Sequence, residues 1–182
     1  VCDVGGGTTD FSLIEIKDER GNLAIERVAV GDHILLGGDN MDLALAHLVK
    51  AKLAAEGKEL DAWQMAALAH GCRAAKEALL SDPKAKSAPI VIPSRGSKLL
   101  GGSIRAELTR DEVSQSLVEG FFPIVPAASR PVSRARTGLT QLGLPYASDP
   151  AMTKHLAAFL GRQAGAVPPK DKKTRAPQLL HP

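Results

Sequence analysis

A short segment near the start of the chain carries groups that could hold a phosphate. Residues 3–10 read Asp-Val-Gly-Gly-Gly-Thr-Thr-Asp. Three consecutive glycines present backbone N–H groups with no side chain in front of them, so the oxygens of an anion can approach the main chain. Thr8 and Thr9 add hydroxyl donors. A plain glycine-rich turn is the structural alternative, although three glycines are more than a turn needs.

Two carboxylates flank this segment and change the chemistry expected of it. Asp3 precedes the glycines and Asp10 follows them. Carboxylates beside a phosphate would repel it unless a hard cation lies between them, so the pair implies Mg²⁺, held directly or through its water molecules. The spacing matches neither a Walker loop nor a dinucleotide-binding fingerprint, so the segment indicates a different kind of phosphate loop.

A second glycine-rich element follows further along the chain. Residues 31–32 read Gly-Asp, and residues 36–39 read Leu-Gly-Gly-Asp directly before a predicted helix. Free N–H groups and the helix dipole attract anions to a helix N-terminus, which makes Gly37 and Gly38 candidate phosphate contacts. An ordinary capped helix start explains the same residues equally well.

The elements that would position these residues begin with three strands. Segments 1–4, 9–17 and 23–30 have the apolar or alternating pattern of strands, and the polar turn 18–22 contains Gly and Asn. Two tight connections in succession predict an antiparallel meander. The glycine segment then lies at the first turn of that meander.

Helices and a hairpin are expected after the meander. Helical spacing of apolar residues predicts one helix from about residue 39 to Gly57 and a second over 61–81. A hairpin over 88–108 follows, and further helices are expected from Thr109 and from Asp149. We divide the chain into 1–39, a partial sheet with the phosphate loop; 40–108, an inserted helix-and-hairpin subdomain; 109–162, further helices and an atypical insert; and 163–182, a flexible, basic, Pro-rich tail.

Charge and composition limit the classes of function. The net charge is +3, and the basic residues of 163–182 account for that excess, so the rest of the chain is neutral. A specific nucleic-acid-binding domain usually carries a basic face with stacking aromatics, but aromatics make up only 3% of this chain. No apolar run approaches the ~20 residues that a membrane span needs. We therefore expect neither a nucleic-acid nor a membrane partner.

The two cysteines, Cys2 and Cys72, lie far apart in the sequence and among apolar residues. We expect both to be buried free thiols, because neither they nor the histidines have metal-ligand spacing. Such thiols favour a reducing, cytoplasmic compartment. Since the chain begins with Val rather than Met, we also expect it to be part of a longer protein.

Together, the two glycine-rich elements resemble a known family. Segments 3–10 and 36–42, the latter reading Leu-Gly-Gly-Asp-Asn-Met-Asp, resemble the second ATPase lobe of the seventy-kilodalton heat-shock chaperones, the DnaK-like Hsp70 family. The resemblance continues through 71–79, Gly-Cys-Arg-Ala-Ala-Lys-Glu-Ala-Leu, which matches a nucleotide-facing helix of that lobe. It continues again at 108–112, Leu-Thr-Arg-Asp-Glu, which resembles a helix start of the family.

The resemblance implies an α/β fold, α+β within this stretch. It would be an actin-like ATPase lobe of the ribonuclease-H-like type, with a three-stranded antiparallel meander and an inserted helix-and-hairpin subdomain. The resemblance covers residues 1 to about 122, whereas 121–160 is similar to an atypical bacterial branch of chaperone-like proteins. It implies ATP or ADP and Mg²⁺ as cofactors, and nucleotide-exchange or co-chaperone proteins as partners.

The resemblance also implies roles for individual residues. Asp3 and Asp10 would be catalytic and metal-binding, positioning the waters of Mg²⁺ or the attacking water. Lys76 would lie against the ribose or base, although a solvated residue on the helix face is the alternative. Arg73 and Glu77 exchange the signs of the usual pair, and a swapped ion pair would still frame the nucleoside pocket. The implied phosphate contacts are Gly5, Gly6, Gly7, Thr8, Thr9, Gly37 and Gly38.

Two other functions are consistent with these residues. A sugar- or acid-kinase lobe of the same superfamily shares the Asp-x-Gly-Gly-Gly-Thr loop, and a non-hydrolysing interaction scaffold would suit the exchanged charges of Arg73 and Glu77. Phosphoryl transfer depends on groups from both sides of a cleft, and the first lobe is absent from this sequence. We therefore expect the chain alone to bind nucleotide weakly and not to hydrolyse ATP.

Overall fold

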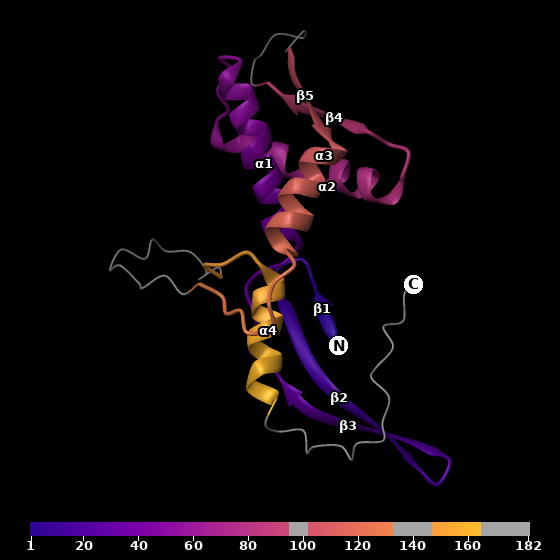
Figure 1. Ribbon diagram of the computed structural model, residues 1–182. Helices are drawn as coiled ribbons and strands as arrows, with labels where there is room; N and C mark the ends of the chain where they lie inside the picture. Colours follow the sequence, from indigo (N-terminus) through magenta and orange to yellow (C-terminus); the bar gives the residue numbers. More distant parts are fainter. Residues whose placement is uncertain (95–101, 133–146, 165–182) are drawn as a thin grey trace.

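The computed structural model describes residues 1–94, 102–132 and 147–164, and its amino-terminal part is a three-stranded sheet. Both strand pairings are antiparallel, which confirms the predicted meander (Figure 1). At the second connection Arg20 and Gly21 have positive φ, 56° and 86°, as a tight turn between twisted strands requires. The strands are β1 (Cys2–Val4), β2 (Thr9–Glu19) and β3 (Asn22–Val30), in that order across the sheet.

Two helices and a hairpin form a second body beside the sheet (Figure 1). The predicted capping box is present, because the Gln64 N–H donates to the Asp61 carboxylate at 2.7 Å and the Asp61 N–H donates to the Gln64 side chain at 3.1 Å. Gly71 lets the second helix approach the hairpin, since a Cβ there would lie 2.7 Å from Cγ2 of Ile90. The elements are α1 (Gly38–Ala55), α2 (Ala62–Ser81), β4 (Ser87–Pro93) and β5 (Ser103–Thr109).

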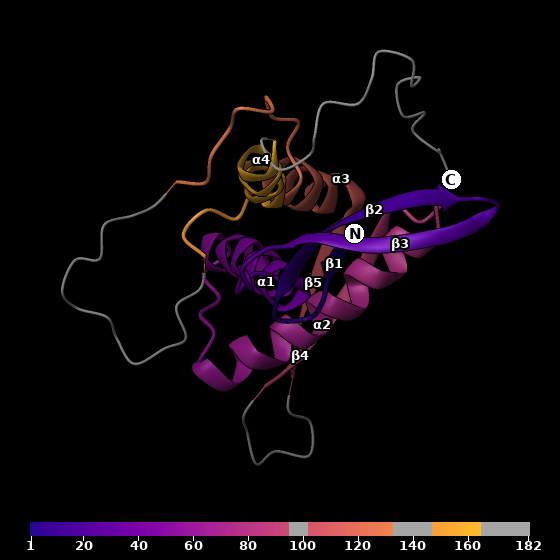
Figure 2. The ribbon, with the colours of Figure 1, turned by 90° about the horizontal axis from the view of Figure 1, so that it is seen from below.

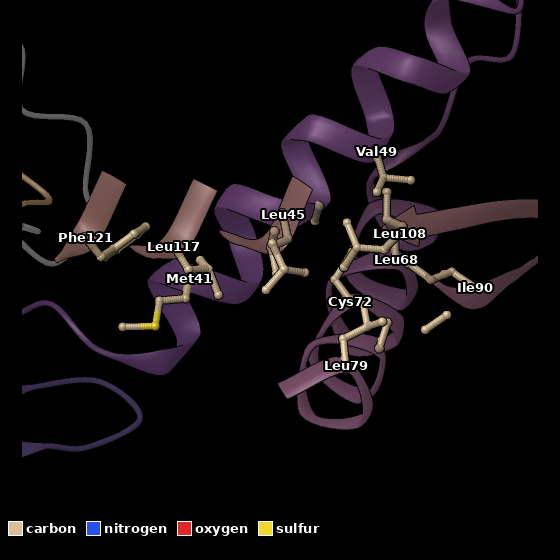
Figure 3. Close-up of a cluster of buried hydrophobic side chains, with 14 of the residues drawn as sticks. Met41, Leu45, Val49, Leu68, Cys72, Leu79, Ile90, Leu108, Leu117 and Phe121 are labelled. Carbon is tan, nitrogen blue, oxygen red and sulfur yellow. The ribbon is translucent and has the colours of Figure 1, made fainter. Parts of the chain in front are cut away.

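The main hydrophobic core lies between α1, α2 and the hairpin (Figure 3). Leu45, Leu68 and Leu79 have no exposed surface, because their helical spacing places them on the faces that the two helices turn toward each other and toward the hairpin. Leu117 and Phe121 join the same core from further along the chain. The predicted segments 40–108 and 109–162 therefore share one core.

Two further helices connect this body to the sheet. α3 (Arg110–Val113) begins at a capping box and continues as a π-helical stretch, Ser114–Glu119. α4 (Met152–Gln163) begins later than predicted, because Asp149 accepts the N–H groups of Val132 and Ala151 and so closes the preceding loop. α4 packs on β2, where the rings of Phe159 and Phe11 lie 5.8 Å apart. Figure 2 shows the tip of the β2–β3 hairpin projecting away from the helices.

Some expectations are corrected or lie outside the described residues. Cys2 is exposed, because its strand lies at the edge of the sheet, whereas Cys72 is buried as predicted. The first long helix begins at Gly38 rather than at 39–40. The tail prediction for 163–182 falls on residues that are described only as far as 164. Within the described ranges, no helix combines the length and apolar character needed to cross a bilayer.

Candidate functional site

The glycine loop joins β1 to β2 and exposes its main chain. A turn closes the loop, because the Gly5 N–H donates to the Thr8 carbonyl at 2.8 Å. Within the residues that the structure describes, the N–H groups of Gly6, Gly7 and Thr8 have no hydrogen-bond acceptor. The glycines are exposed and Thr8 is half-buried. The loop therefore offers adjacent backbone amides to a ligand.

The fold itself does not require a glycine at position 7. In the described part of the chain the glycines with positive φ are Gly21 and Gly57, neither of which belongs to the loop. A Cβ built on Gly7 would meet no atom within 4 Å. The space in front of this residue is open, which is the condition for a ligand to approach its main chain.

The start of α1 lies directly against the back of the loop. The Gly38 N–H donates to the Gly5 carbonyl at 3.0 Å, and the Asp39 N–H donates to the Gly6 carbonyl at 2.8 Å. A Cβ on Gly37 would lie 2.5 Å from the Gly6 oxygen and 2.6 Å from the Gly5 oxygen. Only glycine at position 37 permits this close approach of the two backbones.

The two glycine-rich elements therefore meet, but the second one presents no free amide at Gly37 or Gly38. The Gly37 N–H donates to the Asn40 side chain at 2.8 Å, and the Gly38 N–H is taken by the loop. The capped helix start, which the sequence left as an alternative, is the arrangement found. Gly37 and Gly38 therefore pack against the glycine loop and support it, and they do not offer free amides to a ligand.

Asp3 and Asp10 are direct partners across the β1–β2 pair. Side chains at such positions lie on the same face of a sheet with their Cβ atoms about 5 Å apart, and two like charges placed there repel each other. The carboxylate of Asp10 accepts a long hydrogen bond from the Thr8 hydroxyl, 3.4 Å, and its other oxygen contacts Nδ1 of His33. Within the described ranges, no group of three or more His, Cys, Asp or Glu side chains could hold a metal ion by side chains alone.

Thr9 differs from its neighbour Thr8 in where its side chain lies. Its residue surface is 0% exposed, and its hydroxyl donates to the Leu36 carbonyl at 2.8 Å. Its main chain pairs with Ile34 in both directions. This hydroxyl ties β2 to the segment that precedes α1 and does not face solvent.

The candidate nucleoside residues lie on α2 and are all ion-paired. The Lys76 ammonium lies 2.5 Å from Oδ1 of Asp42 on α1, with both side chains largely buried. Arg73 and Glu77 form an exposed pair one helical turn apart, at 3.1 Å. The hydrogen bond that the Arg73 guanidinium donates to the Glu77 carboxylate raises the pKa of Arg73 above its usual value. The alternative that Lys76 is a solvated residue on the helix face is therefore wrong.

Asp39 connects the helix face to the glycine loop. Its carboxylate oxygens would lie 3.7 Å from a Cβ atom added to Gly6. Glu77 has the largest effect in raising the pKa of Arg73, and the charge of Asp42 comes next. The charge of the Asp39 carboxylate makes a smaller contribution in the same direction. The loop and the α2 residues thus lie at one end of α1.

Sequence reasoning did not identify Asp39, Asp42 or His33 as members of the site. Asp39 and Asp42 belong to the motif 36–42, so their sequence position was a usable signal. The pairing of His33 with Asp10 depends on strand register, which the sequence pattern leaves undetermined.

Comparisons with known proteins show the family of the chain. A family model described as Hsp70 protein matches residues 1–135, which extends past residue 122, where the resemblance was expected to end. The chain is also similar to curated proteins named "Chaperone protein HscA homolog". The protein from Burkholderia lata is 33% identical over 135 residues, and the one from Burkholderia pseudomallei is 34% identical over the same length.

These relatives are much longer than the chain. The matches from B. lata and B. pseudomallei cover 74% of this chain but 19% of the relative. A protein of the same name from Burkholderia cenocepacia is 36% identical over 85 residues, which is 47% of this chain and 13% of the relative. The chain thus corresponds to about a fifth of the length of the relatives that it matches.

Proposed function

The chain belongs to the Hsp70 family, and from that premise we propose that its glycine loop binds the phosphate groups of ATP or ADP within an Hsp70-like ATPase domain. One observation carries the proposal: the adjacent amides of Gly6, Gly7 and Thr8 point to no acceptor in the described chain. Backbone amides in such a row form a concave site for phosphate oxygens. The open space at Gly7 leaves room for them.

The loop is also held in place before any ligand arrives. The carbonyls of Gly5 and Gly6 accept hydrogen bonds from the first turn of α1, so the opposite edge of the same peptides is left for the ligand. A site whose main chain is fixed in advance loses less conformational freedom on binding. The resemblance gave Gly5 a direct phosphate contact, but its N–H and its carbonyl are both hydrogen-bonded within the chain. We assign Gly5, Gly37, Gly38 and Thr9 to this supporting role and the direct contacts to Gly6, Gly7 and Thr8.

Asp3 and Asp10 suit Mg²⁺ held mainly through water. Mg²⁺ in nucleotide sites commonly takes one or two carboxylates, several waters and phosphate oxygens, and it does not need a cluster made only of side chains. The unfavourable pairing of two carboxylates across β1 and β2 would be relieved by such an ion. When bound, the ion would neutralise charge on the phosphates. Asp3 and Asp10 would orient its waters or the attacking water.

The base and ribose would lie toward α2. Lys76 is held by Asp42, so it would offer its remaining N–H donors from a fixed position. Arg73 and Glu77 would frame the pocket as a swapped ion pair. Asp39, between the loop and Arg73, marks the direction in which the nucleotide would extend.

Hydrolysis would be a property of the whole protein. Phosphoryl transfer relies on positioning and charge stabilisation from both sides of the nucleotide, and this chain supplies one side. We propose that the chain alone binds nucleotide more weakly than micromolar and does not turn it over. Exchange factors or co-chaperones would act on the complete ATPase domain in the cytoplasm.

A second candidate function is a non-hydrolysing interaction scaffold. It is favoured by the charges on α2, because Lys76, Arg73 and Glu77 each have a partner within the chain. A scaffold would use those pairs for stability rather than for contact with a nucleoside. No observation favours the sugar- or acid-kinase alternative, and the match to the Hsp70 family model supports a chaperone-like ATPase domain instead.

The test is a titration of the ¹⁵N-labelled chain with Mg-ADP, followed by amide chemical shifts. We expect saturable shifts at Gly6, Gly7 and Thr8, while the distant turn at Gly21 stays unchanged. Gly7→Ala should keep the fold but lower the affinity about tenfold, because its new Cβ would occupy the space of a phosphate oxygen.

The matched control is Gly120→Ala, which places its Cβ 4.0 Å from the nearest atom and far from the loop in sequence. It should bind like the wild type. Absence of shifts in the loop, or equal affinities of the Gly7→Ala chain and the wild type, would contradict nucleotide binding at this site. A micromolar dissociation constant or measurable turnover by the chain would contradict the proposed weakness.

A further inference from the structure

The segment after β3 returns to β2 beside the glycine loop. The Thr9 N–H donates to the Ile34 carbonyl at 2.9 Å, and the Ile34 N–H donates to the Thr9 carbonyl at 3.1 Å. In an antiparallel bridge of this kind, the next residue on one strand faces the preceding residue on the other. His33 is therefore the cross-strand neighbour of Asp10.

Asp10 thus has a neighbour on each side of its strand. Asp3 is its partner on β1, and His33 is its neighbour on the returning segment. Residues opposite one another across antiparallel strands project from the same face, so the three side chains form a row across the sheet. One carboxylate repels Asp10 and the imidazole attracts it.

Both oxygens of the Asp10 carboxylate have a protein contact. Nδ1 of His33 contacts Oδ1, and the Thr8 hydroxyl donates to Oδ2 at 3.4 Å. The His33 side chain is 85% exposed, so this imidazole contributes almost nothing to the core. Among the residues that the structure describes, Asp10 is the polar partner of this side chain.

We propose that His33 is a positioning residue for Asp10, holding the carboxylate beside the glycine loop in the orientation that a Mg-nucleotide needs. This role rests on the proposed nucleotide binding. Repulsion from Asp3 favours rotation of Asp10 away from the row, and the Nδ1–H of His33 opposes that rotation. A carboxylate already held in place does not lose its rotational freedom when the ligand binds.

The chemistry of the contact allows a sharp choice of variants. The side-chain nitrogen of asparagine is bonded to Cγ, as Nδ1 of histidine is, whereas the nitrogen of glutamine lies one bond further out. His33→Asn can therefore keep the hydrogen bond to Asp10, while His33→Ala and His33→Gln cannot keep it in the same place. None of these changes disturbs the main-chain bridge at Thr9 and Ile34.

The role is tested by measuring two affinities of each variant, one for ADP with Mg²⁺ and one for ADP in EDTA. Both are obtained from the amide chemical shifts of the glycine loop. We expect His33→Ala and His33→Gln to weaken Mg-ADP binding about fivefold, the value of one hydrogen bond, and to leave binding in EDTA unchanged. His33→Asn should restore the wild-type value. His47→Ala, an exposed histidine on α1, is the matched control and should have no effect.

A second readout does not depend on nucleotide. The ¹⁵N shifts of the free chain should show His33 protonated on Nδ1, and Asp10→Ala should abolish that preference. If the wild type binds Mg-ADP and His33→Ala binds it equally well, the role of His33 is overturned while the proposed function stands. The same conclusion follows if His33→Ala loses as much affinity for ADP in EDTA as for Mg-ADP, or if His33→Asn does not restore the affinity for Mg-ADP. A wild type that binds no nucleotide would overturn the proposed function itself.

Discussion

The ammonium of Lys76 lies 2.5 Å from Oδ1 of Asp42, and the pair joins α2 to α1 with 13% and 9% of the two side chains exposed. That carboxylate oxygen accepts no hydrogen bond of normal geometry from the described residues. Lys76 is therefore its counter-charge. The same lysine on α2 is the proposed contact for a nucleoside, so a change at this residue would affect stability as well as the proposed binding.

Lys76→Met should destabilise the chain by about 3–5 kcal/mol, because it leaves the Asp42 carboxylate buried without a counter-charge. Urea unfolding followed by circular dichroism measures this. The double variant Lys76→Met with Asp42→Leu should recover most of the loss, since replacing both charges removes the penalty. Lys50→Met, at an exposed position on α1, should change the free energy of unfolding by no more than about 0.5 kcal/mol. A single variant as stable as the wild type would contradict this account of the pair.

Gly37 and Gly38 should respond in opposite directions to the same substitution. Gly37→Ala forces a Cβ to within 2.5 Å of the Gly6 oxygen, so the loop and the helix must separate at a cost of about 1–3 kcal/mol. In Gly38→Ala the Cβ would lie 3.8 Å from its nearest neighbours and at the first position of a helix, so stability should stay equal or rise by up to about 1 kcal/mol.

Thermal unfolding of the two variants measures the difference, and amide shifts of Gly6 and Gly7 report whether the loop has moved. The shifts should change in Gly37→Ala and stay close to the wild type in Gly38→Ala. Equal stability of the two variants would show that the close backbone approach is not what requires glycine at position 37.

Much of the fold was predictable because local signals agree with it. The capping boxes at Asp61 and Thr109 begin helices where the sequence indicated. Gly21 supplies positive φ at the second turn as predicted, but the other residue with positive φ there is Arg20 and not the asparagine. The sequence predicts that α4 begins too early because an aspartate at position 149 could cap a helix, whereas the Asp149 carboxylate accepts the N–H of Val132 from an earlier segment of the chain. Local patterns do not contain that contact.

The candidate site was predictable in its glycines and not in its partners. The segment 5–7 is exposed as expected, because it forms the turn between two strands at the surface of the sheet. Contacts such as Lys76 with Asp42 or His33 with Asp10 depend on how helices pack and how strands register, so residue types alone do not specify them. The same applies to the amide of Gly38, whose acceptor comes from the loop.

Cys72 should make stability depend on pH in the alkaline range. Burial, with a smaller contribution from the Asp42 charge, raises the pKa of this thiol to about 12 from 9.0. Between those values the unfolded chain releases the proton and the folded chain retains it, so the folded state binds more protons and the free energy of unfolding falls as pH rises from about 9 toward 12. Below pH 9 both states keep the proton and the effect vanishes.

Urea midpoints measured across this range check the effect, with Cys72→Ala as the comparison. The variant should be less stable throughout, because it leaves a small cavity, but its midpoint should decline less steeply above pH 9. In the native wild type a thiol reagent should modify the exposed Cys2 and leave Cys72 unmodified until the chain unfolds. Identical alkaline slopes for the two chains would contradict the role of this thiol.

Thr9 offers the clearest separation of support from ligand contact. Thr9→Val has nearly the same shape but lacks the hydroxyl that donates to the buried Leu36 carbonyl, so it should lower the free energy of unfolding by about 1–3 kcal/mol. Thr9→Ser keeps the donor and should lose less. Because the hydroxyl does not face the loop surface, the fraction of Thr9→Val that is folded should bind Mg-ADP like the wild type, as measured by amide shifts at a temperature well below its unfolding midpoint. Thr8→Val, at the neighbouring half-buried position, should show the reverse, with stability kept and affinity reduced. A loss of affinity in folded Thr9→Val would show instead that this hydroxyl reaches the phosphates.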